Sequence, residues 1–288
     1  MNDFRTLGRR QLIAGAAMLA ALPAVAQKKS VLDRIREETG GRIGVAVYDS
    51  ETGRRYFDGA EARFAMCSTF KVPLAAAVLA RADRGEIDLK REIRFGEADL
   101  LDYAPVVKAN LAKGALSIEA LLEAAVVMSD NAAANLVFGQ ISGPRGLTKF
   151  IRSTGDAISR SDRDEPSLNI VRGGEVRDTT TPMAMLWMLN AILLGETLSP
   201  ASRAKLLGWM EASPTGKERL RAGMPKTWRV GDKTGTSGEG YFNDIAIATP
   251  PGRKPILVTC YLDAPGLDGA KANAAHAKVG ALVGALFA

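Results

Sequence analysis

The chain has 288 residues, a formal net charge of +6, one histidine and two cysteines, and its length suits one large domain or two interlocked ones with a substantial core. His276, Cys67 and Cys260 are distant from one another and form no cluster with the spacing of metal ligands, so neither a metal cofactor nor a metal-dependent hydrolase is expected. The positive charge is not gathered into a basic block with interleaved aromatic residues, so nucleic-acid binding has no support.

The N-terminus carries a predicted export signal of the twin-arginine type. Arg9 and Arg10 precede an apolar run, Leu12 to Ala26, that ends in a small-residue pattern. The run is shorter than the roughly 20 apolar residues that span a bilayer, which argues against the alternative of a membrane anchor. No later run is long enough to span a membrane. We therefore expect cleavage of residues 1–26, a mature start at Gln27 and a periplasmic protein without membrane contact; other export routes stay open.

The two ends of the mature chain contain the predicted strands. After a short amphipathic helix, Val31 to Glu38, the runs Arg42 to Asp49 and Arg54 to Asp58 flank a turn and predict a hairpin. An alanine-rich segment with helical spacing, Gly269 to Phe287, finishes the chain. Before it come three β-type runs: Trp228 to Thr234, Phe242 to Thr249 and Pro255 to Asp263.

The middle of the chain is predicted to be helical. From about Phe64 to Ala212, alanine and leucine recur with helical spacing, and strand signals are few. The order of helix, two strands, long helical block, three strands and helix predicts one mixed sheet domain with an all-helical insertion. A ligand is expected in the cleft between the two parts.

The first chemical signal is a serine followed by a lysine three residues later, Ser68 and Lys71. About one such match is expected by chance in a chain of this length, and Ser202 with Lys205 is a second one. Ser68 directly precedes an apolar helical run, where free N–H groups and the helix dipole favour negative charge. Lys71 lies on the same helical face and can reach the serine oxygen. The alternative interpretation of Ser68 is a helix N-cap.

A serine nucleophile needs a group that takes its proton. His276 has no neighbouring serine or carboxylate that suggests a triad, and we expect it on a helix surface. A lysine made neutral by burial or by a second cation can take the proton instead. Lys71 is the candidate for that role, and Lys233 would supply the second cation.

These elements together resemble the penicillin-recognising serine enzymes, whose signature is Ser-x-x-Lys, Ser-Asp-Asn and Lys-Thr-Gly. The three motifs stand here in that order, at Ser68 to Lys71, Ser129-Asp130-Asn131 and Lys233-Thr234-Gly235. Flanking segments agree over nearly the whole mature chain, for example Gly143 to Thr148 and Asp178 to Pro182. The chain is identified as similar to the class A serine β-lactamases.

The resemblance implies an α/β (α+β) fold with an antiparallel five-stranded sheet flanked by helices, an all-helical domain, and the active site in the cleft between them. The sheet domain would comprise residues 27–62 and 213–288, and the all-helical domain residues 63–212. No cofactor is implied, and a β-lactam is the expected partner of what we take to be a monomer.

The resemblance also implies roles for single residues. Ser68 would form the acyl-enzyme, Lys71 would accept its proton, and Ser129 would pass a proton to the lactam nitrogen. The backbone N–H groups of Ser68 and Thr236 would form an oxyanion hole, in which one donor is typically worth about 3 kcal/mol. The substrate's side-chain amide and carboxylate would be bound by Asn131, Lys233, Thr234, Gly235 and Thr236.

Glu165 separates a hydrolase from a penicillin-binding peptidase, because hydrolysis of the acyl-serine needs a general base for water. By resemblance, Glu165 supplies this base and Asn169 helps to position the water; whether Lys71 or Glu165 is the acylation base stays open. The implied structural features of this loop are an ion pair between Arg163 and Asp178 and a cis peptide bond before Pro166. Asn135 is implied to have a structural role.

Other positions concern the range of substrates. Some family members keep an arginine that directs the substrate carboxylate at the position of Arg219, and others keep it at the position of Phe242. Because this chain has the arginine at the first position, we expect Arg219 to take that role beside Thr236. Cys67 precedes the nucleophile as in carbapenem-hydrolysing members, but Ser237 stands where their bridging cysteine would be. We expect free thiols at Cys67 and Cys260, with one bridge as the alternative.

Tyr103 matches an aromatic residue that lines the cleft of the family, and the alternative is a core aromatic. Two other functions share part of the signature. A D-Ala-D-Ala peptidase would give Glu165 and Asn169 no purpose, and a non-catalytic β-lactam sensor would not explain an intact nucleophile and base.

Overall fold

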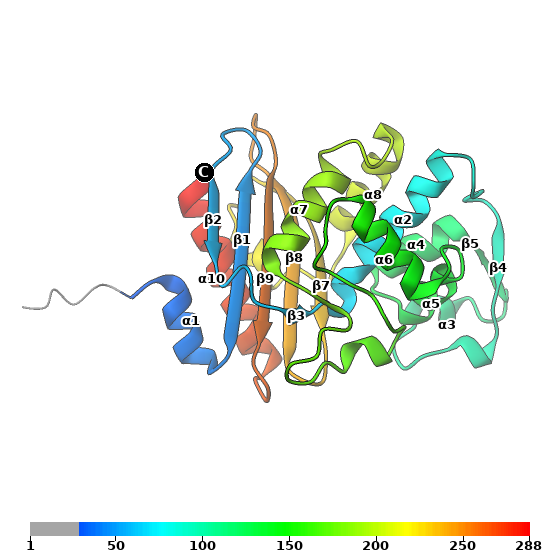
Figure 1. Ribbon diagram of the computed structural model, residues 1–288, viewed down its shortest axis with the longest axis horizontal. Helices are drawn as coiled ribbons and strands as arrows, with labels where there is room; N and C mark the ends of the chain where they lie inside the picture. The colour runs from blue at the N-terminus through cyan, green and yellow to red at the C-terminus, as the bar shows by residue number, and fades with distance from the viewer. Residues whose placement is uncertain (1–28) are drawn as a thin grey trace, which may run out of the picture.

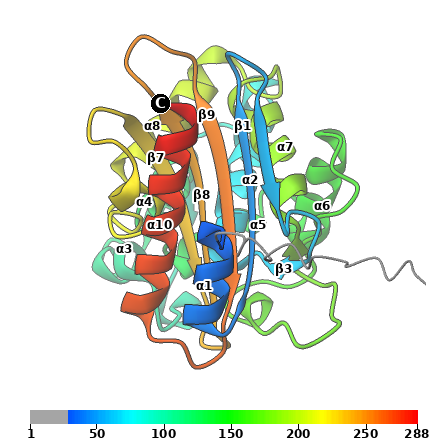
Figure 2. The same ribbon diagram turned by 90° about the vertical axis from the view of Figure 1, so that its left-hand side faces the viewer.

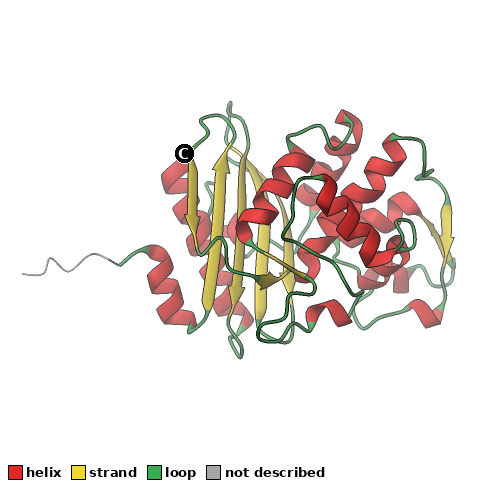
Figure 3. Ribbon diagram, in the orientation of Figure 1, coloured by secondary structure: helices red, strands yellow, loops and turns green. Residues whose placement is uncertain are grey.

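The computed structural model describes residues 29–288 (Figure 1). The export signal predicted at residues 1–26, with its twin-arginine pattern, lies outside the described residues. A sheet lies on one side of the molecule and most of the helices lie on the other (Figure 3). Within the described part, no helix combines the length and the apolar character needed to cross a bilayer.

The main sheet joins the two ends of the chain. Its strand order is β2-β1-β9-β8-β7, and every neighbouring pair is antiparallel, which confirms the predicted five-stranded antiparallel sheet. The first two strands form the expected hairpin, and the last three form a meander. The strands are β1 (Arg42–Asp49), β2 (Arg55–Asp58), β7 (Arg229–Thr236), β8 (Tyr241–Thr249) and β9 (Ile256–Asp263).

Two terminal helices, α1 (Val31–Thr39) and α10 (Gly269–Phe287), cover the outer face of the sheet (Figure 2). The short α9 (Leu220–Gly223) packs against α10. α1 begins at a capping box, in which Ser30 and Asp33 each accept a hydrogen bond from the other's backbone N–H. Helices and sheet bury one apolar cluster that includes Leu32, Ile35, Val45, Val258 and Val279.

The other face of the sheet packs against α7, and behind it lies the helical part. At the centre of that part, α2 is buried continuously from Lys71 to Ala80, which is why its sequence is apolar all round instead of along one stripe. The helices are α2 (Lys71–Asp83), α3 (Pro105–Ala109), α4 (Ile118–Val127), α5 (Asn131–Phe138), α6 (Gly143–Ser153), α7 (Pro182–Leu193) and α8 (Pro200–Ala212).

Two short sheets within residues 63–212 were not predicted. β3 (Phe64–Ala65) pairs with β6 (Thr179–Thr180), and β4 (Glu92–Arg94) pairs with β5 (Ala115–Ser117). Strands of two or three residues are too short to show an alternating pattern, so only their pairing partners reveal them. β3 with β6 matters for function because it ties the segment before Ser68 to the end of the Glu165 loop.

The surface position expected for His276 is wrong, because this side chain is fully buried on the inner side of α10. Ala272, Ala275, His276 and Val279 follow the helical spacing of the face that packs on the sheet. Burial, with Arg219 nearby, lowers the pKa of His276 to about 3. The two cysteines, Cys67 and Cys260, are buried free thiols, as expected.

Candidate active site

Ser68 lies in a short 3-10 helix, η1 (Cys67–Phe70), that runs directly into α2. Asn243 of β8 holds this segment against the sheet, since its side-chain amide donates to the carbonyls of Ala65 (2.9 Å) and Met66 (3.1 Å). A Cβ on Gly235 would lie 2.9 Å from the Met66 carbonyl and 3.2 Å from the Ser68 nitrogen. A glycine is therefore needed in the third signature motif, because β7 passes so close to the serine.

Lys71 is fully buried and contacts groups from three parts of the chain. Its Nζ donates to Ser68 Oγ at 2.9 Å, to the Ser129 carbonyl at 2.9 Å and to Asn131 Oδ1 at 2.5 Å. Glu165 Oε1 lies 3.1 Å from the same Nζ. Burial lowers the pKa of Lys71, and the Glu165 carboxylate acts in the opposite direction. The lysine thus links the serine to the Ser-Asp-Asn motif and to the loop carboxylate.

The Ser-Asp-Asn motif combines a helix cap with two side chains of the site. Asp130 accepts the N–H of Ala133 at 2.8 Å and caps α5, and it also accepts the N–H groups of Val106 (2.8 Å) and Val107 (3.0 Å). These bonds hold α3 against α5. Ser129 and Asn131, on either side of the aspartate, both reach Lys71.

Lys233 is the second buried ammonium group of the site. Its Nζ donates to Ser129 Oγ at 3.0 Å and to the Thr234 carbonyl at 2.9 Å. Burial and the neighbouring Lys71 lower the pKa of Lys233 to about 7, although Asp232 acts in the opposite direction. Ser129 Oγ lies between the two lysines, 3.4 Å from Lys71 Nζ, so a proton can pass along this line of groups.

Arg219 lies beside Thr236, where it was expected. Its Nη2 donates to Thr236 Oγ1 at 2.6 Å, and its Nη1 donates to the carbonyls of Gly235 (3.0 Å) and Asn243 (2.6 Å). Its Nε donates to Asn273 Oδ1 at 3.0 Å. These acceptors hold the guanidinium in one orientation at the end of β7.

Glu165 is buried and held through its backbone and its side chain. Asn135 of α5 accepts the Glu165 N–H at 3.0 Å and donates to its carbonyl at 2.8 Å. Asn169 Nδ2 donates to Glu165 Oε2 at 2.6 Å. The peptide bond between Glu165 and Pro166 is cis, as the resemblance implied. The carboxylate therefore faces Lys71 with one oxygen and Asn169 with the other.

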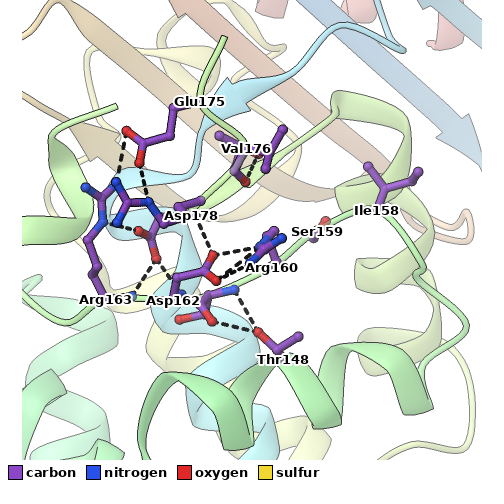
Figure 4. Close-up of polar contacts among 12 residues, drawn as sticks. Thr148, Ile158, Ser159, Arg160, Asp162, Arg163, Glu175, Val176 and Asp178 are labelled. Carbon is purple, nitrogen blue, oxygen red and sulfur yellow. Dashed lines mark hydrogen bonds and ion pairs between the residues drawn. The ribbon is translucent and has the colours of Figure 1, made fainter. Parts of the chain in front are cut away.

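The neck of the Glu165 loop is closed by reciprocal bonds around Asp178 (Figure 4). Asp178 accepts the N–H groups of Asp162 (2.7 Å) and Arg163 (3.0 Å), and Arg163 Nε at 2.6 Å. In return, the Asp178 N–H donates to Asp162 Oδ2 at 3.1 Å. The expected ion pair between Arg163 and Asp178 is thus present, and it is one bond of a larger clasp. Glu175 is a weaker partner of Arg163, at 3.7 Å.

Two sequence candidates lie apart from these contacts. Tyr103 is 49% exposed, so its alternative interpretation as a core aromatic is wrong; its carbonyl accepts the Asn131 N–H at 3.0 Å, which places it at the edge of the site. The second Ser-x-x-Lys match is structural, because Ser202 Oγ donates to Asp83 at 2.6 Å and Lys205 pairs with Glu119.

Three residues of the site were missed in the sequence. Thr215 lies 2.8 Å from the Thr234 hydroxyl, Asn243 holds the serine segment, and Asn273 holds Arg219. Each is a single polar residue outside any spaced motif, so no sequence signal marked it. In the described residues, no group of three His, Cys, Asp or Glu side chains is arranged to hold a metal ion.

Comparison with known sequences shows which proteins this chain is similar to. A family model described as "Beta-lactamase enzyme family" matches residues 27–287. Beta-lactamase L2 of Stenotrophomonas maltophilia is 43% identical over 94% of this chain and 87% of its own length, and Beta-lactamase OXY-2 of Klebsiella oxytoca is 38% identical over 89% and 87%.

Solved structures agree with the same relationship. An ancestral (GNCA) class A beta-lactamase superposes with a TM-score of 0.87 at 51% identity, covering 89% of this chain and 98% of that one. A beta-lactamase from Xanthomonas campestris pv. campestris has a TM-score of 0.87 at 47% identity and covers 90% and 96%.

We predict that Asp178→Asn loosens the loop between residues 163 and 178. The amide retains a carbonyl oxygen for the backbone N–H groups but loses the charge that Arg163 contacts, and a charge-assisted bond of this kind is worth about 1.5–3 kcal/mol. Amide hydrogen exchange of peptides from this loop should accelerate at least about tenfold. Glu175→Gln, which alters the longer contact of Arg163, serves as the control and should change exchange little. Unchanged exchange in Asp178→Asn would mean that the clasp does not hold the loop.

Proposed function

Because the chain belongs to the class A serine β-lactamases, and so is a hydrolase of β-lactams that confers resistance to these antibiotics, we propose that it acts through an acyl-enzyme on Ser68. The contact that supports this proposal is the 2.9 Å approach of Lys71 Nζ to Ser68 Oγ inside a buried site. We also propose penicillins and cephalosporins as the substrates. The site would lie between a sheet domain, residues 27–62 and 213–288, and a helical domain, residues 63–212.

In the acylation step, Ser68 Oγ attacks the lactam carbonyl and its proton passes to Lys71. Lys71 is the group in contact with the hydroxyl, and its lowered pKa favours the neutral form that can accept a proton. Glu165 Oε1 lies 3.1 Å from Lys71 Nζ. The proton that Lys71 takes from the serine is therefore held between the lysine and this carboxylate. The oxyanion is stabilised by the backbone N–H groups of Ser68 and Thr236.

Ring opening needs a proton on the lactam nitrogen, and Ser129 delivers it. Its Oγ is within 3.0 Å of Lys233 Nζ and 3.4 Å of Lys71 Nζ, so the proton that it donates is replaced from a neighbouring ammonium. Asn131 binds the side-chain amide of the substrate. Lys233 and Thr234 bind the substrate carboxylate, and Arg219 and Thr236 lie beside them. Gly235 allows the close approach of β7 to Ser68.

In the deacylation step, Glu165 activates a water molecule against the ester. Asn169 Oδ1 is buried with no hydrogen bond to the described residues, and the contact of the buried Glu165 Oε1 is the ion pair with Lys71 Nζ at 3.1 Å, so each oxygen has a lone pair that can accept a hydrogen bond from this water. The carboxylate is held in place by the clasp of Arg163 with Asp178 and by the hydrogen bonds of Asn135 to the Glu165 backbone. Tyr103 borders the cleft at its exposed edge. A penicillin-binding peptidase would not need this arrangement.

Glu165→Ala should trap the acyl-enzyme, since the serine and Lys71 remain while the base for water is lost. Mass spectrometry after mixing with a penicillin should show protein heavier by the whole substrate mass, because ring opening releases no fragment. Glu175→Ala, a carboxylate of the same loop outside the site, should turn over normally, and Ser68→Ala should form no adduct. Rapid release of product by Glu165→Ala would remove Glu165 from this role. Wild-type protein that hydrolyses neither a penicillin nor a chromogenic cephalosporin would contradict the proposed substrates.

Recognition of the carboxylate should weaken at alkaline pH. Lys233 has a pKa of about 7 in the free protein, so above this pH it loses the positive charge that attracts the substrate. The value of kcat/KM should fall by up to about tenfold per pH unit above that point. Lys233→Arg, whose side chain stays charged, should shift this fall to higher pH. An identical alkaline limb in both proteins would show that another group controls it.

We further propose export to the periplasm by the twin-arginine route, and action there as a monomer. The paired arginines, Arg9 and Arg10, before the apolar run support the route. N-terminal sequencing of protein released from the periplasm should begin at Gln27. A protein retained in the cytoplasm with residues 1–26 intact would contradict the export proposal.

A further inference from the structure

A cavity of about 920 Å³ lies between α2 and α6, two helices of the helical part that pack against each other (Figure 1). Ala77 and Arg81 line it from α2, and Arg145 and Lys149 line it from α6. Lys71 stands ten residues before Arg81, so the cavity lies about 15 Å along α2 from the proposed active site. The volume is in the range of small-molecule sites, and none of the residues that we place in the proposed chemistry lines the cavity.

The lining of this cavity is strongly basic. Four cationic side chains, Arg81, Arg84, Arg145 and Lys149, face one carboxylate among the described residues, that of Glu86, so the lining has a formal net charge of +3. Glu86 is shared by two of the cations, because it accepts Arg81 Nε at 2.9 Å and Arg84 Nε at 2.5 Å. Its charge is therefore spent on the α2 side of the cavity, and the α6 side stays positive.

The two cations of α6 are placed where α6 itself gains nothing from them. The side chains of Arg145 and Lys149 have no acidic partner among the described residues, and like charges four residues apart on a helix repel each other. Arg145 also lies in the first turn of α6, which has no acidic residue and where the helix dipole disfavours a cation. Asp83, at the end of α2, accepts the Ser199 N–H at 2.8 Å and the Ser202 hydroxyl at 2.6 Å, so it is engaged at the start of α8. Departures of this kind from local preference are expected at functional sites.

We propose that this cavity binds a small phosphate monoester. A phosphate monoester carries a charge of about −1.5 to −2 near neutral pH, so it offsets a net charge of +3 better than a carboxylate with a single charge. Arginine side chains suit it further, because the guanidinium group can donate two parallel hydrogen bonds to a phosphate. The organic part of the ester would lie on the apolar side chains of the lining, Ala77, Ala80, Ile141 and Phe150. A soluble ester and the headgroup of a lipid share this chemistry, and the enclosed position between two helices favours the soluble ester.

Isothermal titration calorimetry with phenyl phosphate at low ionic strength tests the site. The wild-type protein should bind one molecule with a Kd below about 1 mM. Replacing both cations of α6, Arg145→Gln with Lys149→Gln, should raise the Kd at least about tenfold, as expected for the loss of hydrogen bonds between charged groups. The matched control removes two exposed cations outside the cavity, Lys254→Gln with Lys271→Gln, and should keep the Kd within about twofold. Thermal unfolding of both double variants reports whether the fold is intact.

Three further measurements separate this site from other places where a phosphate could bind. Benzoate, with the same ring and one negative charge, should bind at least about fivefold more weakly than phenyl phosphate. Saturating phenyl phosphate should leave penicillin hydrolysis uninhibited, whereas competitive inhibition would place the phosphate in the active site and overturn the inference. Equal affinity for benzoate, or equal weakening in the two double variants, would overturn it as well. So would binding to vesicles of phosphatidylcholine and phosphatidic acid without binding of phenyl phosphate, because a membrane surface and not the cavity would then recognise the phosphate.

Discussion

Two buried ammonium groups, Lys71 and Lys233, are the constraint on which the rest of the site depends. Removing a charged amine from water is costly, and placing two close together adds repulsion. The structure offsets this cost with oxygen acceptors from several segments: Ser68, Ser129, Asn131 and Glu165 around Lys71, and Ser129 with the Thr234 carbonyl around Lys233. Because these acceptors come from both the sheet and the helical part, the site exists only when the two are packed together.

The free-energy cost of burying the two charged amines is also the source of the proposed reactivity of the site. Burial lowers the pKa of both lysines, that of Lys233 to about 7, so each amine gives up its proton more readily than it would in water. This replaces the imidazole of a histidine triad, and the single histidine of the chain is buried in a different place, on the inner side of α10. Ser129 Oγ, between the two amines, gives the proton a short path.

The surrounding fold keeps the acceptors where the lysines need them. Asp130 and Asp178 contribute no atom to the proposed chemistry, yet each accepts several N–H groups and thereby fixes a neighbour: Asp130 the turn with Ser129 and Asn131, and Asp178 the neck of the loop with Glu165. Charged carboxylates suit this role because one side chain can accept several bonds at once. Thr215 extends the same principle to a neutral hydroxyl, which accepts the Thr234 hydroxyl at 2.8 Å.

The sequence by itself determined the strands and helices with long, regular patterns, and the motifs at Ser68, Ser129, Glu165 and Lys233, because local periodicity and fixed spacing are properties of the chain alone. It placed Arg219 beside Thr236 through resemblance. The tertiary structure alone decided that His276 is buried, that Tyr103 is exposed, that short strands join Phe64 to Thr180, and that Thr215 meets Thr234. Each of these depends on which distant segment packs against the residue, and contacts between residues far apart in the chain leave no periodic signal in it.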